Sequence, residues 1–225
     1  MKLLSINNDA KTIKGQQFGY LTGILHLRPS IHLCPGATKG CFKSCLNTAG
    51  HGAMNNVQQT RQRKTELYMK KTDVFKSLLF WEIAELTAKA HKMGLQPAVR
   101  INGTSDIDVQ KVFKDILEYY TDVQFYDYTK VYKRMFMPCR PNYHLTYSRS
   151  EETSLRSIKI LTKLLKKNVA VVFDEVPEEW EGIKVINGDK HDLRFMDEQG
   201  VIVGLKAKGK ARKDDSGFVV KVKGV

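Results

Sequence analysis

Three of the four cysteines in this chain lie in one short segment, CPGATKGCFKSC, at positions Cys34, Cys41 and Cys45. A proline and two glycines between the first two cysteines interrupt regular structure and let the backbone fold back on itself. Three soft thiolate ligands that point toward one position are typical of a metal centre. Spacings of six and three residues suit chelation better than disulfides in a reducing cell, so the sequence predicts that these cysteines ligate a metal.

Two alternatives are open for the metal. Three cysteines can hold a [4Fe-4S] cluster with one open iron, or a zinc ion that needs a further ligand. His32 and His51 flank the segment and could complete a zinc site, as could Cys139 from a distant loop. The segment lacks the short CxxC pairs of ribbon-type zinc sites, which favours the iron–sulfur cluster.

The alternation of strand-like and helix-like patterns indicates how these cysteines are positioned. Strands are predicted over residues 17–27, 98–101, 123–126, 143–147, 169–173, 184–186 and 201–205, and helices over 57–71, 73–93, 109–119 and 153–166. This order predicts an α/β fold of mainly parallel strands, closed as a (β/α) barrel or partly closed, with the three-cysteine loop after the first long strand. Asp73 is expected to cap the second helix, and Gly94 to end it.

Polar segments follow nearly every predicted strand, as in INGTSD, YDYTK and YSRS. In parallel barrels the loops after the strands meet on one face, so we expect these segments to share a mouth with the cysteines. The alternative is that they are only turns, because Gly, Asn, Asp and Ser are common turn residues.

Asn102, Ser105 and Asp106 are the first candidates for cofactor binding, through hydrogen bonds to a ribose, an amino-acid moiety or a base edge. Arg100 lies one pleat earlier on the same side of its strand and is a candidate substrate ligand. The alternative is an Asx-type turn in which Asp106 or Asp108 caps the next helix.

The end of the strand predicted over 123–126 carries a carboxylate, two aromatic rings and an ammonium group, which come from Tyr126, Asp127, Tyr128 and Lys130. The rings are candidates for stacking on a base of the substrate. Asp127 and Lys130, together with Asp106, are the candidate catalytic groups. The alternative for Asp127 and Lys130 is a buried ion pair.

Ser148 and Arg149 form a further candidate cofactor site, because an arginine fork can bind a phosphate or carboxylate. The neighbouring Ser150 is more simply explained as a helix N-cap.

The formal net charge of +13 favours a polyanionic partner, either nucleic acid or a nucleotide-bearing substrate. Basic residues concentrate at 61–71, 130–140 and 206–213. In the last of these, Lys206, Lys208 and Lys210 are predicted to share one face of an extended segment that follows phosphates. A solvated basic strand is the alternative.

The chain reads as one domain over residues 1–225, without a linker or repeat. Its N-terminal apolar stretch is too short for a signal peptide, and no later run is long enough to span a bilayer. We therefore expect a cytoplasmic protein without a membrane partner.

The three-cysteine loop after a first strand resembles that of radical S-adenosylmethionine enzymes, in which a partial barrel holds a [4Fe-4S] cluster. The resemblance implies that S-adenosylmethionine binds the open iron and that a reductant is needed. The spacing here, CxxxxxxCxxxC, departs from the CxxxCxxC of that family.

Across nearly its whole length the chain also resembles an uncharacterised bacteriophage family catalogued as gene product 88. The matching stretches are LLSINNDAKTIKG, CPGATKGCFKSCLNTAGHGAM, VRINGTSDI, VQFYDYTK, NYHLTYSRSE, DLRF and VIVGLKAKGKARK. This resemblance implies a phage origin and expression in the cytoplasm of a host bacterium, but it implies no activity.

Two functional hypotheses follow. The first is an iron–sulfur enzyme of the radical S-adenosylmethionine type that acts on a nucleotide-related substrate. The second is an iron–sulfur or zinc protein that binds nucleic acid without catalysis.

Overall fold

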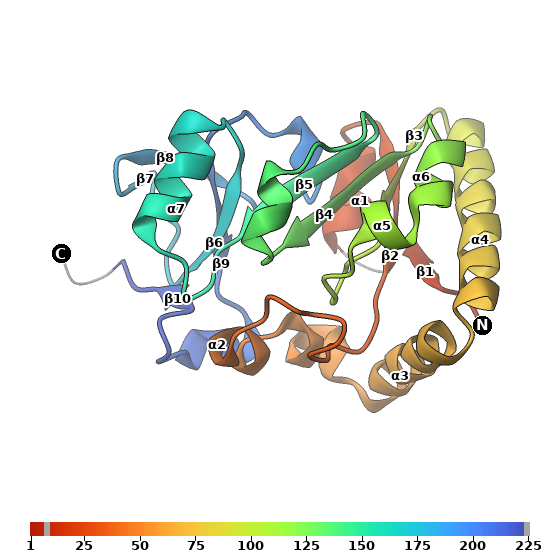
Figure 1. The fold of residues 1–225 in the computed structure, drawn as a ribbon, viewed down its shortest axis with the longest axis horizontal. Coiled ribbons are helices and arrows are strands. Elements are labelled where there is room, and N and C mark those ends of the chain that lie inside the picture. The colour runs from red at the N-terminus through yellow and green to blue at the C-terminus, as the bar shows by residue number, and fades with distance from the viewer. Residues whose placement is uncertain (7–9, 223–225) are drawn as a thin grey trace.

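The structure is a computed structural model that describes residues 1–6 and 10–222. Its centre is a sheet in the order β1-β2-β3-β4-β5-β6-β9-β8-β7, with β10 paired to β6 (Figure 1). The strands are β1 (Leu4–Ile6), β2 (Tyr20–Leu25), β3 (Gln96–Arg100), β4 (Gln124–Thr129), β5 (Tyr143–Ser148), β6 (Val169–Phe173), β7 (Glu179–Trp180), β8 (Ile183–Asn187), β9 (Ile202–Lys206) and β10 (Val219–Val220).

The strands from β2 to β8 along this order are all parallel, which confirms the prediction of a mainly parallel α/β sheet. The sheet is open, however, and the prediction of a closed barrel is wrong. Its two edges are the short strands β1 and β7, each antiparallel to its neighbour. Short antiparallel edge strands end a sheet because they offer few free backbone groups to a further strand.

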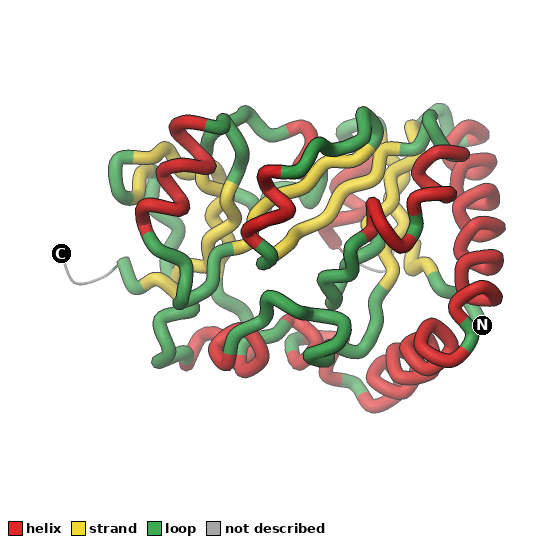
Figure 2. The backbone as a smooth tube through the Cα atoms, in the orientation of Figure 1, coloured by secondary structure: helices red, strands yellow, loops and turns green. Residues whose placement is uncertain are grey.

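Helices lie along both faces of the sheet and below it in the view of Figure 2. The helices are α1 (Ala10–Gln16), α2 (Lys39–Lys43), α3 (Asn55–Lys70), α4 (Thr72–Lys92), α5 (Val109–Val112), α6 (Lys114–Tyr119) and α7 (Leu155–Lys159), and the short 3-10 helices used below are η1 (Leu46–Thr48), η5 (Arg194–Met196) and η6 (Gly209–Lys213).

Helix α4 shows why the sequence periodicity was informative. Its fully buried residues recur every three or four positions, which places them on one face against the sheet: Phe75, Leu79, Ile83, Leu86 and Ala90. The helix stops before Gly94, whose φ of +67° is unfavourable for residues with a side chain. The predicted cap was wrong, because the N-cap residue is Lys71 and Asp73 lies in the first turn.

Two other predicted helices differ in detail. The helix expected over 109–119 is divided between α5 and α6, and Asp108 caps α5 by accepting a hydrogen bond from the amide of Lys111. The helix expected over 153–166 begins with Ser154 as its N-cap, not Ser150. The amide of Ser150 instead donates to Thr153 Oγ1, within the turn that precedes α7.

The two faces of the sheet differ in polarity. On β4, Phe125 packs into the main apolar core, whereas its neighbour Tyr126 points to the opposite face and donates to Asp192. That second face is covered by α1 and by the segment that contains η5, since Gly15 lies against Leu193. The apolar face stabilises the fold, and the polar face carries three of the candidate substrate ligands, Arg100, Tyr126 and Tyr128.

Candidate metal centre

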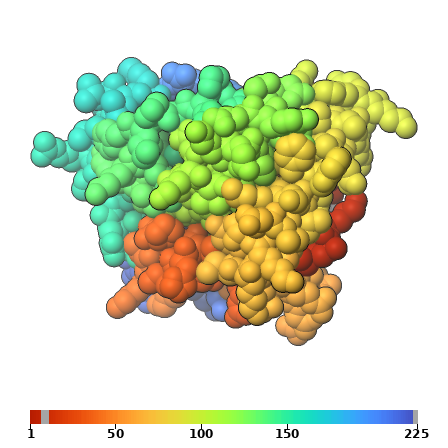
Figure 3. Space-filling view, turned by 45° about the vertical axis from the view of Figure 1, so that its right-hand side comes forward, coloured from red at the N-terminus to blue at the C-terminus, as the bar shows by residue number. Residues whose placement is uncertain are grey.

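The cysteine segment follows β2 and crosses the carboxyl edge of the parallel strands. The amide of Asp106, after β3, donates to the carbonyl of Leu33 at 2.7 Å. Gly36 lies so close to Lys130, after β4, that an added Cβ would come within 2.7 Å of the Lys130 backbone. In Figure 3 the orange part of the chain lies directly below the green part. The predicted common edge for the cysteines and the two polar loops is therefore present.

Short helical turns fix the backbone around two of the cysteines. Thr38 caps α2 by accepting a hydrogen bond from the amide of Cys41 at 3.2 Å. Cys45 caps η1, because its Sγ accepts from the amide of Asn47 at 3.5 Å. The thiol of Cys34 lies 3.9 Å from the carbonyl oxygen of Thr104.

Glu151, directly after β5, holds this segment against the sheet. Its carboxylate accepts from Thr38 Oγ1 at 2.7 Å and from the amide of Gly40 at 2.8 Å. A Cβ on Gly40 would lie 2.7 Å from the same carboxylate, so glycine permits the close approach. Partial burial opposes the charge, but these hydrogen bonds lower the pKa of Glu151.

The three thiols are close enough to affect one another. All three are free cysteines, and burial raises the pKa of each, that of Cys34 to about 11. The charges of Cys41 and Cys45 raise the pKa of Cys34 further, and Cys45 does the same to Cys41. The thiols are therefore protonated at neutral pH unless a cation replaces their protons.

The donor set suits a thiophilic metal, but the side chains do not yet form a coordination shell. Among the described residues, no group of three or more His, Cys, Asp or Glu side chains is arranged to hold a metal ion. Metal binding by Cys34, Cys41 and Cys45 would require their side chains to turn toward one another.

Arg61, on α3, is a buried cation next to Cys45. Its Nη1 donates to Asn47 Oδ1 at 2.5 Å, while its Nε is buried without a hydrogen-bond partner. Burial lowers the pKa of Arg61, and Cys45 is the group that raises it. No ion pair of Arg61 occurs within the part of the chain that the structure describes. A buried guanidinium without a carboxylate favours negative charge nearby.

Lys130 is a second cation beside the thiols, since its charge lowers the pKa of both Cys41 and Cys45. Its Nζ donates to the carbonyls of Ser148 and Arg149 and to the Ser148 hydroxyl, at 2.9–3.3 Å. It also lies 4.8 Å from the ring centre of Phe218. The Nζ donors of Lys130 are thus used, and the side chain links the loop after β4 to the end of β5.

Asn102 and Ser105 form a self-contained turn after β3. The Asn102 side chain donates to the carbonyl of Ile107 and accepts from the amide of Ile107 and the hydroxyl of Ser105, at 2.8–3.0 Å. This is the turn that was expected as the alternative to ligand binding. The polar groups of both side chains are largely used inside the loop.

Asp106 connects three loops of the carboxyl edge. One of its carboxylate oxygens accepts from the amide of Lys130 at 2.8 Å, and the other from Arg134 Nη1 at 2.6 Å. The partnership with Arg134 is a nearly buried ion pair. Its position next to the thiols agrees with a shared edge, but its contacts are those of a structural residue.

Arg100, Tyr126 and Tyr128 meet on the polar face of the sheet around Asp192. Arg100 forms an ion pair of 2.8 Å with Asp192, and its guanidinium carbon lies 4.6 Å from the centre of the Tyr128 ring. Tyr126 is fully buried and packs edge-on against Phe195. Base stacking on Tyr126 or Tyr128 stays a prediction, which this arrangement disfavours because Tyr126 is fully buried and Arg100 lies over the Tyr128 ring.

Asp127 points to the other face of the sheet, away from Lys130. Its carboxylate accepts from the amide of Asn102 at 2.6 Å and from the hydroxyl of Tyr143 at 3.2 Å. Burial raises the pKa of Asp127 to about 7, although these hydrogen bonds and Arg100 oppose the rise. The alternative of an Asp127–Lys130 ion pair is thus wrong.

Arg149 and the basic C-terminal segment lie on the same edge. Arg149 Nη1 donates to the carbonyls of Gly217 and Phe218, at 2.8 and 3.1 Å. Beyond Lys206 the strand ends, and η6 begins at Gly209. The prediction of one extended face for the three lysines is therefore wrong, although Lys206, Lys208 and Lys210 are all exposed.

Three residues of this region were not singled out from the sequence. Glu151 contacts the cysteine segment from 111 positions away, Arg61 contacts Asn47 just beyond that segment, and Asp192 pairs with Arg100, 92 positions earlier. Of these three residues, only Glu151 has a position that indicates its contact with the cysteine segment, because it follows a predicted strand.

The fold and this edge define an α/β protein with an open, mainly parallel sheet and a cysteine-bearing segment across its carboxyl edge. The family model described as Gene product 88 matches residues 2–222, so the chain belongs to the Gene product 88 family. This confirms the resemblance noted from the sequence. No curated protein and no solved structure matches the chain. The resemblance to radical S-adenosylmethionine enzymes stays a prediction. Among the described residues, no helix is long and apolar enough to cross a membrane.

Proposed function

We propose that this protein is a phage iron–sulfur protein of the host cytoplasm whose [4Fe-4S] cluster is held by Cys34, Cys41 and Cys45. The observation that carries the proposal is the contrast between three interacting free thiols and the buried cation Arg61 beside them. Three thiolates and a cluster carry net negative charge, which would compensate the guanidinium.

A ligand-binding role follows from the number of cysteines. A cluster with three cysteine ligands leaves one iron open to a small ligand, such as S-adenosylmethionine. When bound, such a cluster supplies electrons for radical or group-transfer chemistry, with an external reductant. Its substrate is expected to be nucleotide-related, because the formal net charge of +13 favours a polyanionic or nucleotide-bearing partner.

Anaerobic purification with iron, sulfide and zinc analysis tests the proposal. The wild-type protein should be brown and contain iron and labile sulfide near cluster stoichiometry. Cys41→Ala should lose the colour and the iron, because one of three ligands is removed. Cys139→Ala is the matched control and should retain both, since Cys139 is an exposed cysteine outside the segment. A colourless wild-type protein with one zinc would contradict the cluster and support the zinc alternative.

A second candidate function, nucleic-acid binding without catalysis, is favoured by the basic rim of this edge. Cys41 packs against the cluster that contains Ala207 and Ala211, so η6 lies beside α2. The exposed cations of the two segments therefore gather near the thiols: Lys39, Lys43, Lys206, Lys208, Lys210, Arg212 and Lys213.

Salt dependence tests this second function. The double substitution Lys206→Glu and Lys210→Glu should weaken nucleic-acid binding and reduce the slope of log affinity against log salt by about one for each phosphate that the protein no longer neutralises. Lys89→Glu with Lys92→Glu, on α4, changes the net charge equally and should leave the slope unchanged. If both double substitutions changed the slope equally, the basic residues of this edge would act only through the net charge of the protein.

A further inference from the structure

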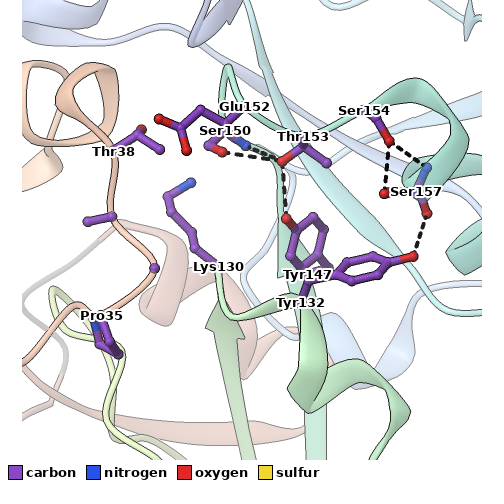
Figure 4. A pocket seen from close by; sticks show the side chains of 12 residues that line it. Pro35, Thr38, Lys130, Tyr132, Tyr147, Ser150, Glu152, Thr153, Ser154 and Ser157 are labelled. Atoms are coloured by element: carbon purple, nitrogen blue, oxygen red, sulfur yellow. Dashed lines mark hydrogen bonds between the residues drawn. The ribbon is translucent and has the colours of Figure 1, made fainter.

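A cavity of about 450 Å³ lies beside the cysteine segment, between it and the loop after β5. The residues between the first two cysteines, Pro35 to Thr38, line one side, and Figure 4 shows Lys130 between them and the two rings of Tyr132 and Tyr147. This volume is within the range of small-molecule sites. The long spacing between Cys34 and Cys41 thus supplies the wall of a cavity.

Hydroxyl groups dominate the opposite wall. A chain of contacts links Ser150, Thr153 and Tyr147, with oxygen–oxygen distances of 3.3 and 3.1 Å. Ser154 and Ser157 lie 2.9 Å apart at the start of α7. In Figure 4, Ser150 and Thr153 lie toward Thr38 and Lys130, whereas Ser154 and Ser157 lie beyond the tyrosine rings. A hydroxyl can donate and accept at once, so such a wall matches a ligand with neighbouring hydroxyls of its own.

The charges of the cavity disfavour an anion. Lys130, the cation among the lining residues, already donates to three acceptors. Glu152 is exposed and lies at the rim near Thr38, where its carboxylate would repel a phosphate. Carboxylates also accept hydrogen bonds from adjacent sugar hydroxyls.

We propose that this cavity binds a neutral, ribose-bearing ligand of nucleoside size, with its diol toward the hydroxyl wall and Glu152. The choice of a nucleoside rests on the proposed function, which expects a nucleotide-related substrate. Binding itself requires only the cavity, so it should persist in Cys41→Ala protein that lacks metal. The absence of a cluster and the absence of ligand binding in this cavity can therefore be observed independently of each other.

Calorimetric titration of the full chain with adenosine tests the site, at about 0.3 M salt to screen surface charge. Adenosine should bind with one site per chain. 2′,3′-Dideoxyadenosine should bind about tenfold more weakly, because the wall would lose its partners. Adenosine monophosphate should bind no more tightly than adenosine. Absence of adenosine binding, or tighter binding of the monophosphate, would overturn the proposal.

Two variants place the ligand in this cavity. The Tyr132 hydroxyl donates to the carbonyl of Ser157 at a long 3.4 Å, so it lies at the same wall. Ser157→Ala and Tyr132→Phe each remove one hydroxyl of this wall and should weaken adenosine binding about three- to tenfold. Tyr119→Phe is the matched control on α6, where the ring is exposed, and should bind as wild type. Thermal unfolding checks that each variant is folded, and alanine is compatible with the helix at position 157. Unchanged affinity in both folded variants would overturn the assignment.

Discussion

Two loops at the carboxyl edge of the sheet carry similar numbers of polar groups but use them differently. In the loop after β3, Asn102 and Asp106 find hydrogen-bond partners within the loop or from its neighbours. In the cysteine segment, the three thiols form no disulfide and make only long contacts, that of Cys45 with the amide of Asn47 and that of Cys34 with the carbonyl of Thr104, while the adjacent Arg61 keeps a buried Nε without a partner. A buried polar group with short hydrogen bonds to its neighbours indicates a structural loop, whereas a buried donor without a partner indicates a place for a ligand.

The largest effect is expected for Asp106→Ala, which disrupts the satisfied loop. The substitution leaves Arg134 without its closest carboxylate and the Lys130 amide without an acceptor. Breaking a buried ion pair by removing one partner costs about 3–5 kcal/mol of unfolding free energy. Urea denaturation of metal-free protein measures this loss.

Asp115→Ala is a suitable control, because Asp115 is exposed and makes only a 3.6 Å pair with Lys76. It should cost less than about 1 kcal/mol. If Asp106→Ala were equally mild, Asp106 would be available to a ligand and the contrast between the loops would fail.

Sequence periodicity is sufficient to predict most helices and strands, but not to predict which loop has its polar groups hydrogen-bonded. The apolar run Val169–Phe173 and the stripe on α4 follow from local pattern, and the alternation of elements placed the loops on one edge. Closure of the sheet depends on the length of edge strands β1 and β7, which the pattern does not encode.

The contacts that distinguish the two loops could not be predicted for a different reason. Glu151 bonds Gly40 across 111 positions, and Arg61 reaches Asn47 from another helix. Such contacts depend on how loops pack in three dimensions. A carboxylate or an amide in a sequence does not show whether its hydrogen bonds are already used.

Asp127→Asn should produce the next largest effect, and its sign depends on pH. Because burial raises the pKa of Asp127 to about 7 in the folded chain, the folded state holds a proton that the unfolded state loses above about pH 4. Wild-type stability should therefore fall as the pH rises from about 4 to 7. The asparagine variant should lack this fall and be about 2–4 kcal/mol more stable at pH 8.

Urea denaturation at several pH values measures the difference. The titratable groups that act on the pKa of Asp127 are Arg100, Tyr143 and Asp106, and none of them is altered by the substitution. If the unfolding free energy of both proteins changed with pH in the same way, the pKa of Asp127 would not be raised in the folded chain.

Glu151→Gln should have the smallest effect, confined to the cysteine segment. The carboxylate that holds Thr38 and Gly40 would become a weaker, neutral acceptor. Loss of about 1 kcal/mol of local stability should increase alkylation of Cys41 in metal-free protein about fivefold, because the segment opens more often. Glu152→Gln, the exposed neighbour, is the control, and equal rates in both variants would show that Glu151 does not restrain the segment.

Native mass spectrometry of the anaerobically purified wild-type chain shows whether the three cysteines hold a cluster, because it reports the bound inorganic group in one measurement. We expect one added mass of four irons and four sulfides, lost in Cys45→Ala and retained in Cys139→Ala. A chain that carries one zinc, or no added mass after anaerobic supply of iron and sulfide, would contradict it.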